Sequence, residues 1–167
     1  MSTNLTKQQL ESGKLGGTHV VKEPIQGFKR IQCDCDPVLG LFLNTDTKNI
    51  ASIATLEIPP GAKIIRAHSF YEDRYVGGET DYVSNKLRAN KAVVKNIEPK
   101  YDNSQKINNL FSTIKNCVCY SLYDKEFKYE IGQTVTPKKD FNSDSSRECE
   151  SGIHFFLDKD EAKDYLR

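Results

Sequence analysis

The sequence contains no tryptophan, a single methionine and almost no net charge. A formal charge of +1 argues against a nucleic-acid-binding domain, because such domains are usually strongly basic. No apolar run approaches the roughly 20 residues of a membrane-spanning helix. The polar N-terminus also lacks the apolar stretch of a signal peptide. We therefore expect an intracellular protein that is neither secreted nor inserted in a membrane.

The motifs of several common enzyme classes are missing as well. The sequence has no G-x-S-x-G, no Walker A loop and no G-x-G-x-x-G. Its two Gly-Gly pairs, at residues 16–17 and 77–78, lack the preceding strand and following helix of a phosphate-binding loop. Enzymatic activity stays open, but these absences favour a protein that is not an enzyme, and nothing in the sequence calls for a cofactor.

The five cysteines are an odd number, which in a chain without an export signal indicates reduced thiols. Two C-x-C pairs stand out, Cys33 with Cys35 and Cys117 with Cys119. A C-x-C pair on a strand places both sulfurs on one face, so the four could form a thiolate metal site. Zinc sites usually have C-x2-C or longer spacing, however, and unpaired cysteine is often a small buried residue. The spacing therefore favours core cysteines, with the metal site as the alternative.

Alternating apolar and polar residues predict a mainly antiparallel β-sheet. We expect strands at residues 24–32, 38–43, 52–58, 63–70, 86–97, 117–122, 127–135 and 153–157. Turns are expected at residues 33–37 and 59–61, the latter because its two prolines fix φ. Another turn or bulge is expected at Gly132. Residues 72–84 are polar and predict an exposed loop or hairpin.

Helical periodicity is limited to short segments. Residues 102–116 carry apolar side chains at i, i+3, i+4 and i+7, and short helices are also expected near residues 7–11 and at 159–166. Asp158 is placed to cap the last of these, and Glu161 to reach back toward the Asp158 amide. We expect residues 1–22 to be a mobile arm and residues 23–167 a single α+β domain. Its mainly antiparallel sheet would carry two or three short helices, including a C-terminal one.

The strand at residues 153–157 and the helix after it suggest a candidate ligand site. Alternation places His154 and Phe156 on one face of the strand, and Ile153, Phe155 and Leu157 on the other. With Tyr165 of the following helix, His154 and Phe156 would then face a ligand. The alternative, which the pattern favours, is a partly exposed histidine on the outer face of an edge strand.

The densest basic stretch of the chain runs from Lys86 to Lys95. Its residues Lys86, Arg88 and Lys95 do not all share one face of a strand. The stretch is typical of solvated charges that protect a sheet edge, with a surface for an anionic ligand as the alternative.

The C-terminal half resembles a domain of unknown function from giant DNA viruses, phages and some bacteria, where it often accompanies pentapeptide repeats. The resemblance is carried by residues 86–92, 123–135 and 149–165, and the strand at 53–58 with its following proline looks like an earlier strand of the same domain. It implies a viral accessory protein in the host cytoplasm and implies no activity.

A second, local likeness concerns the ADP-ribosyltransferases. Gly152-Ile153-His154-Phe155, followed by Ala162 and Tyr165, is similar to their G-I-Y-F…A…Y segment. In that family the first tyrosine lines the NAD site and the second stacks on nicotinamide, roles that would fall to His154 and Tyr165. Histidine replaces the first tyrosine here, and no later strand with the catalytic glutamate is expected before Arg167. The likeness therefore implies at most a degenerate member.

Two functions follow from these patterns. The first is a non-enzymatic viral accessory module that binds an unknown protein partner, with the eight tyrosines available for an interface. The second is a nucleotide-binding or NAD-binding protein with a concave pocket beside His154 and Tyr165.

Overall fold

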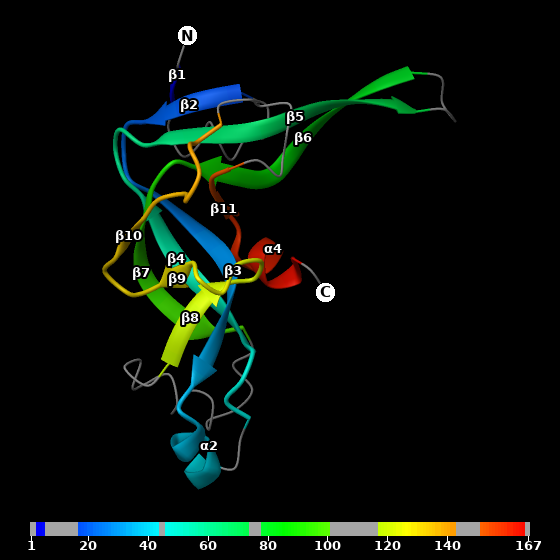
Figure 1. Ribbon diagram of the computed structural model, residues 1–167. Coiled ribbons are helices and arrows are strands. Elements are labelled where there is room, and N and C mark those ends of the chain that lie inside the picture. Colours follow the sequence, from blue (N-terminus) through cyan, green and yellow to red (C-terminus); the bar gives the residue numbers. More distant parts are fainter. Residues whose placement is uncertain are drawn as a thin grey trace.

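The computed structural model describes residues 3–5, 17–43, 46–73, 78–100, 117–142 and 151–165. These residues form two β-sheets, five-stranded and six-stranded (Figure 1). The five-stranded sheet has the order β1 (Thr3–Leu5), β2 (Gly17–Val21), β5 (Lys63–Asp73), β6 (Gly78–Ala89), β11 (Ile153–Phe155). The six-stranded sheet has the order β10 (Thr134–Val135), β7 (Ala92–Pro99), β4 (Ile50–Ile58), β3 (Ile25–Cys35), β8 (Cys117–Ser121), β9 (Lys128–Tyr129).

The fold is mostly antiparallel β, as the alternating sequence patterns predict. Every strand pair in the described chain is antiparallel except β1 with β2. Helix is limited in this part of the chain to α2 (Pro37–Leu43) and α4 (Lys159–Asp164). Of the two or three short helices expected, the described residues contain only the C-terminal one where it was expected, and α2 lies where a strand was expected. The helices expected at residues 7–11 and 102–116 lie outside the described residues.

The core lies along the strands and is aliphatic. Its fully buried members come from both sheets and include Ile31, Leu56, Ile58, Ile64, Leu87 and Phe155. Burying each such side chain contributes roughly 1.5–3 kcal/mol relative to leaving it in water. Strand β2 contributes Val21 to the core, and residues 17–20 of the expected mobile arm are paired with β5.

Three local predictions need correction. Residues 38–43 were expected to form a buried strand, but they belong to α2, with Val38 59% and Leu41 82% exposed. The helix starts there because Pro37 is preorganised for its first turn and Asp36 accepts from the Val38 amide at 2.8 Å. The turn expected at residues 33–37 begins later, since β3 continues to Cys35.

The third correction concerns residues 86–97, which were expected to be one strand. They are divided between β6 and β7, because the chain turns at Asn90. The amide of Asn90 donates to Lys63 O at 3.1 Å, and its side-chain oxygen accepts from the Lys63 amide at 2.8 Å. The turn expected at Gly132 is confirmed, with φ +86° between β9 and β10.

Strand β11 connects the two sheets. It pairs with β6, and directly after it Phe156 exchanges two backbone hydrogen bonds with Phe28 of β3, at 2.7 and 2.8 Å. Gly27 permits this close approach, because a Cβ at this position would lie 2.3 Å from the Phe155 ring. The chain from β11 into α4 is therefore fixed against both sheets (Figure 1).

Candidate functional site

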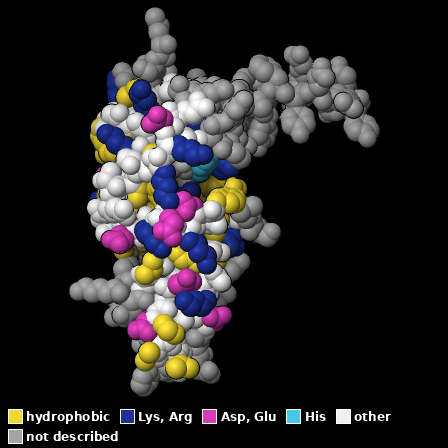
Figure 2. All heavy atoms as spheres, viewed as in Figure 1, with side chains coloured by type: hydrophobic (Ala, Val, Ile, Leu, Met, Phe, Trp, Pro, Cys, Tyr) yellow, Lys and Arg dark blue, Asp and Glu magenta, His cyan; other side chains and the backbone are white. Residues whose placement is uncertain are grey.

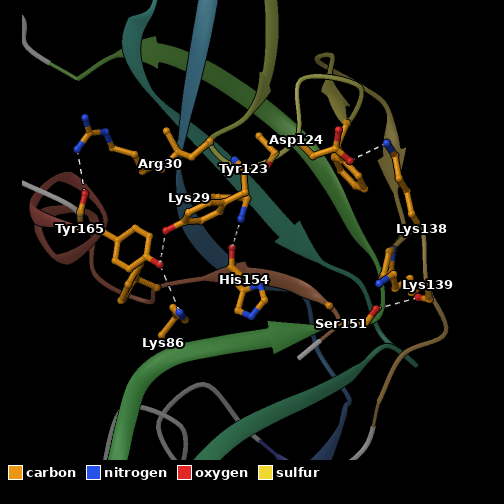
Figure 3. A pocket seen from close by; sticks show the side chains of 16 residues that line it. Lys29, Arg30, Lys86, Tyr123, Asp124, Lys138, Lys139, Ser151, His154 and Tyr165 are labelled. Carbon is orange, nitrogen blue, oxygen red and sulfur yellow. Dashed lines mark hydrogen bonds and ion pairs between the residues drawn. The ribbon is translucent and has the colours of Figure 1, made fainter. Parts of the chain in front are cut away.

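A cavity of about 710 Å³ opens beside β11 (Figure 3). It is lined by Lys29, Arg30, Lys86, Ser121, Leu122, Tyr123, Asp124, Phe127, Pro137, Lys138, Lys139, Ser151, Gly152, His154, Phe156 and Tyr165. These residues come from β3, β6, β11 and its flanking residues, the ends of β8 and α4, the loop between β8 and β9, and the loop after β10. The cavity thus lies where segments far apart in the sequence meet.

The three residues proposed from the sequence as a ligand site all line this cavity. His154 and Phe156 face it from the β11 segment, and Tyr165 faces it from the end of α4. On the opposite face of β11, Ile153 and Phe155 are 2% and 0% exposed, as the alternation predicts. Strand β11 is the last strand of its sheet, but the bridge to β3 makes His154 part of a cavity wall. Binding of a ligand by these residues stays a prediction.

Tyr165 is held in place by contacts from three directions. Lys86 Nζ lies 3.4 Å from its hydroxyl and 5.2 Å from its ring centroid, so the cation contacts both parts. The hydroxyl also lies 3.1 Å from that of Tyr123, and Arg30 Nη1 donates to its backbone oxygen at 2.9 Å. The ring packs at 5.5 Å from that of Phe156. Tyr165 is therefore a fixed wall of the cavity.

Helix α4, which leads to Tyr165, begins at the predicted N-cap residue Asp158. Asp158 Oδ1 accepts from the amides of Asp160 at 2.7 Å and Glu161 at 3.2 Å. These bonds satisfy amides that a helix N-terminus leaves without a helical partner. The Glu161 side chain accepts from Asn85 of β6 at 3.0 Å, which ties the helix to the five-stranded sheet.

Lys29 has the most strongly shifted pKa among the residues that line the cavity. Its ammonium donates to His154 O at 3.0 Å (Figure 3). Burial, and secondly the charge of Lys86, lower the pKa of Lys29 to about 8. Two ammonium groups are thus close enough to repel each other beside one cavity.

The opposite end of the cavity is also basic. Lys138 Nζ forms an ion pair with Asp124 at 2.7 Å, and this hydrogen bond is the main reason why the pKa of Asp124 is lowered. Ser151 Oγ donates to Lys139 O at 2.9 Å. Altogether the lining includes five Lys or Arg side chains and one carboxylate, which is already paired. The electrostatics favour an anionic occupant.

Arg88 supports the cavity wall by bonding to the backbone at Ser151, one of its lining residues. Its side chain is 1% exposed, and Nη1 donates to Asn142 O at 2.6 Å and to Ser151 O at 3.0 Å. A buried cation is tolerated only when hydrogen bonds replace its water shell. The two bonds hold the chain on either side of residues 143–150 against β6.

The four cysteines of the hypothesised metal site are brought together, but as disulfides. Cys33 is bonded to Cys119, and Cys35 to Cys117, across β3 and β8. The expectation of reduced thiols, which rested on the odd cysteine count and the lack of an export signal, is therefore wrong for these four. A disulfide sulfur is not the thiolate that a metal binds, so a metal site here would require the reduced protein. Among the described residues no group of three or more His, Cys, Asp or Glu is arranged for a metal ion.

Sequence reasoning missed Lys29, Arg30 and Tyr123, and assigned Lys86 to a sheet edge. Lys86 is 8% exposed and lines the cavity instead. Its position in a basic run was visible in the sequence, but its neighbours were not. Lys29 and Lys86 lie close together because β11 pairs with β6 and the residue after it bridges to β3.

Comparison with known proteins identifies relatives without a known activity. The model of a family of unknown function, DUF5758, matches residues 18–162. An uncharacterised protein of Acanthamoeba polyphaga mimivirus is 40% identical over 121 residues, which is 72% of this chain and 65% of that protein. A second uncharacterised mimivirus protein is 32% identical over 115 residues, 68% of this chain and 58% of that protein. The matched region is thus less than two thirds of either relative.

No solved structure matches the chain significantly. The resemblance to a giant-virus domain of unknown function is confirmed by these comparisons. They lend no support to an association with pentapeptide repeats or to the ADP-ribosyltransferase likeness. Within the described residues, no helix is long and apolar enough to cross a membrane.

Proposed function

We propose that this chain, which belongs to the family of unknown function DUF5758, is a binding module that holds an anionic ligand in the cavity beside β11. One observation carries the proposal: the ammonium groups of Lys29 and Lys86 converge on a cavity walled by Tyr165. An anion between them would relieve their repulsion and form charge-assisted hydrogen bonds, which contribute roughly 1.5–3 kcal/mol each.

The arrangement favours binding over catalysis. The hydroxyl of Ser151 donates to a backbone oxygen, and the carboxylate of Asp124 is engaged by Lys138 and by the Glu126 amide at 2.9 Å. These groups support the cavity wall and are not paired as a nucleophile with its base. We therefore retain the non-enzymatic reading and assign it to this cavity.

The partner-binding reading has less support than the cavity. Tyr120 and Tyr129 are each 3% exposed, so these two tyrosines serve the core and not an interface. The transferase alternative required a concave pocket beside β11, and the cavity supplies one. Tyr165, however, is covered by Lys86 and Phe156, which leaves its ring poorly placed to stack on nicotinamide. Similarity to mimivirus proteins supports a viral accessory role in the host cell.

The proposal is tested by titrating the purified protein with inorganic pyrophosphate in a calorimeter. Lys86→Met removes one charge from the cavity. Lys128→Met is the matched control, because Lys128 lies 5.5 Å from the Tyr120 ring, a similar contact outside the cavity. We expect wild type and Lys128→Met to bind alike, and Lys86→Met to bind about 10–100-fold more weakly. Equal affinity of all three proteins, or no binding by any, would contradict the proposal.

A further inference from the structure

The cavity is much larger than an anion needs. Its volume of about 710 Å³ falls within the range of roughly 300–1,000 Å³ that is typical of small-molecule sites. An inorganic phosphate would fill only a small part of this space. The remaining volume therefore implies an organic group attached to the charged one.

The charge at the Lys29 end favours a dianion. Lys29 and Lys86 repel each other, and burial adds to the cost of holding Lys29 protonated. A carboxylate brings one negative charge, whereas a phosphate monoester carries about −1.5 to −2 at neutral pH. A phosphate ester therefore compensates both ammonium groups, and guanidinium Arg30 lines the same cavity.

The exposed ring of Tyr123 lies near the ammonium group of Lys86, close enough for one small molecule to contact both. Tyr123 is 72% exposed, although its hydroxyl is held 3.1 Å from that of Tyr165. The Tyr165 hydroxyl in turn lies 3.4 Å from Lys86 Nζ. Figure 3 shows this chain of contacts beside the Lys29–His154 hydrogen bond. An anchored but exposed ring beside cations is typical of sites where a nucleobase stacks next to its phosphate.

We infer that the ligand is a nucleotide, with its phosphate between Lys29 and Lys86 and its base on the ring of Tyr123. This inference rests on the proposed function and adds the class of ligand. Phe127 and Phe156 also line the cavity and offer apolar contacts to the sugar and base. The stacking is tolerant of the base, because every base has an aromatic face.

The inference is tested by calorimetric titration with nucleoside 5′-monophosphates, inorganic phosphate, phenyl phosphate and adenosine. We expect AMP to bind at least tenfold more tightly than inorganic phosphate, phenyl phosphate or adenosine. Tyr123→Ala should weaken AMP binding about tenfold more than it weakens inorganic-phosphate binding, whereas Tyr123→Phe should retain most of the AMP affinity. Ile131→Ala is the control, since Ile131 is another exposed apolar side chain, 42% exposed, outside the cavity.

The outcomes separate the inference from the proposed function. Equal affinity for AMP, phenyl phosphate and inorganic phosphate would overturn the nucleotide assignment and leave the anion-binding module in place. The same conclusion would follow if Tyr123→Ala bound AMP like wild type. Absence of binding by every phosphate compound would overturn both.

Discussion

Lys29 combines a cost in stability with a proposed role in binding. Its pKa of about 8 in the folded protein lies below the ordinary value of 10.5, so the unfolded chain binds more protons between these two pH values. The free energy of unfolding should therefore rise as the pH increases from about 8 to about 10.5. Below pH 8 the full cost of keeping the half-buried Lys29 charged remains.

Replacing Lys29 by methionine should expose this trade-off. We expect Lys29→Met to melt at a higher temperature than wild type at pH 7, by about 2–4 °C for each kcal/mol gained in the free energy of unfolding. The variant should also lose part of the rise in the free energy of unfolding that wild type shows above pH 8. The same variant should bind pyrophosphate at least tenfold more weakly. Thermal melts across the pH range and calorimetry measure the two effects, with Lys128→Met as a surface control. A variant that melts lower at pH 7, or binds like wild type, would argue against this assignment.

Gly27 sets the distance between β3 and β11. A Cβ at this position would lie 2.3 Å from Cδ2 of Phe155, whose ring is fully buried. We expect Gly27→Ala to destabilise the protein by about 1–3 kcal/mol, a typical cost of overpacking. Urea unfolding of Gly27→Ala, Phe155→Leu and the double variant measures the coupling. The double variant should be more stable than the sum of the single changes implies, whereas additive effects would show that the two residues do not collide.

At the scale of elements, the N-cap predicted for α4 at Asp158 is confirmed, whereas Glu161 accepts from Asn85 and not from the Asp158 amide. Asp158→Ala removes the acceptor for two amides and should cost about 1 kcal/mol, within a range of roughly 0.5–2. Asp158→Asn keeps an acceptor oxygen and should remain near wild-type stability. Because α4 leads to Tyr165, we also expect weaker phosphate binding in the alanine variant alone. Chemical denaturation and calorimetry of the pair measure this, and equal behaviour of the two variants would refute a capping role.

The two disulfides of β3 and β8 are expected to act non-additively. They span 86 and 82 residues, but once one is formed the other closes only a very short additional loop. In the loop-entropy description, removing one pair by Cys35→Ala and Cys117→Ala should cost about 2 kcal/mol, and removing all four cysteines should cost about 6–7 kcal/mol. Urea unfolding under oxidising conditions compares the variants. Equal costs for the first and second pair removed would contradict this reasoning.

The secondary structure of some elements could be predicted from the local sequence, and that of others could not. The faces of β11 were predictable, because side chains of a strand alternate regardless of its partners. Residues 38–43 were misassigned, since the local signals of Asp36 and Pro37 outweigh the apolar run that suggested a strand. Two separate strands at residues 86–97 were not anticipated, because the turn depends on Asn90 bonding to Lys63 in β5.

For the molecule as a whole, the near-neutral net charge conceals an uneven distribution. The lining of the cavity has five Lys or Arg side chains and one carboxylate, whereas on the face shown in Figure 2 Lys and Arg side chains lie among Asp and Glu, with a histidine exposed beside them. Composition alone showed only the sum of +1 and argued against a nucleic-acid-binding domain. One wall of the cavity, with His154, Phe156 and Tyr165, followed from sequence patterns. The wall with Lys29 and Tyr123 did not, because it depends on the approach of β3 to β11 through Phe28 and Phe156.

The most direct measurement is an NMR titration of the lysine side chains, labelled with ¹³C at Cε, with and without inorganic phosphate. Lys29→Met identifies the resonance of Lys29. We expect this lysine to have a pKa of about 8 without phosphate and a higher pKa with it, because an anion beside the ammonium group favours the protonated form. A Lys29 pKa near 10.5, or one that phosphate leaves unchanged, would contradict an anion site between Lys29 and Lys86.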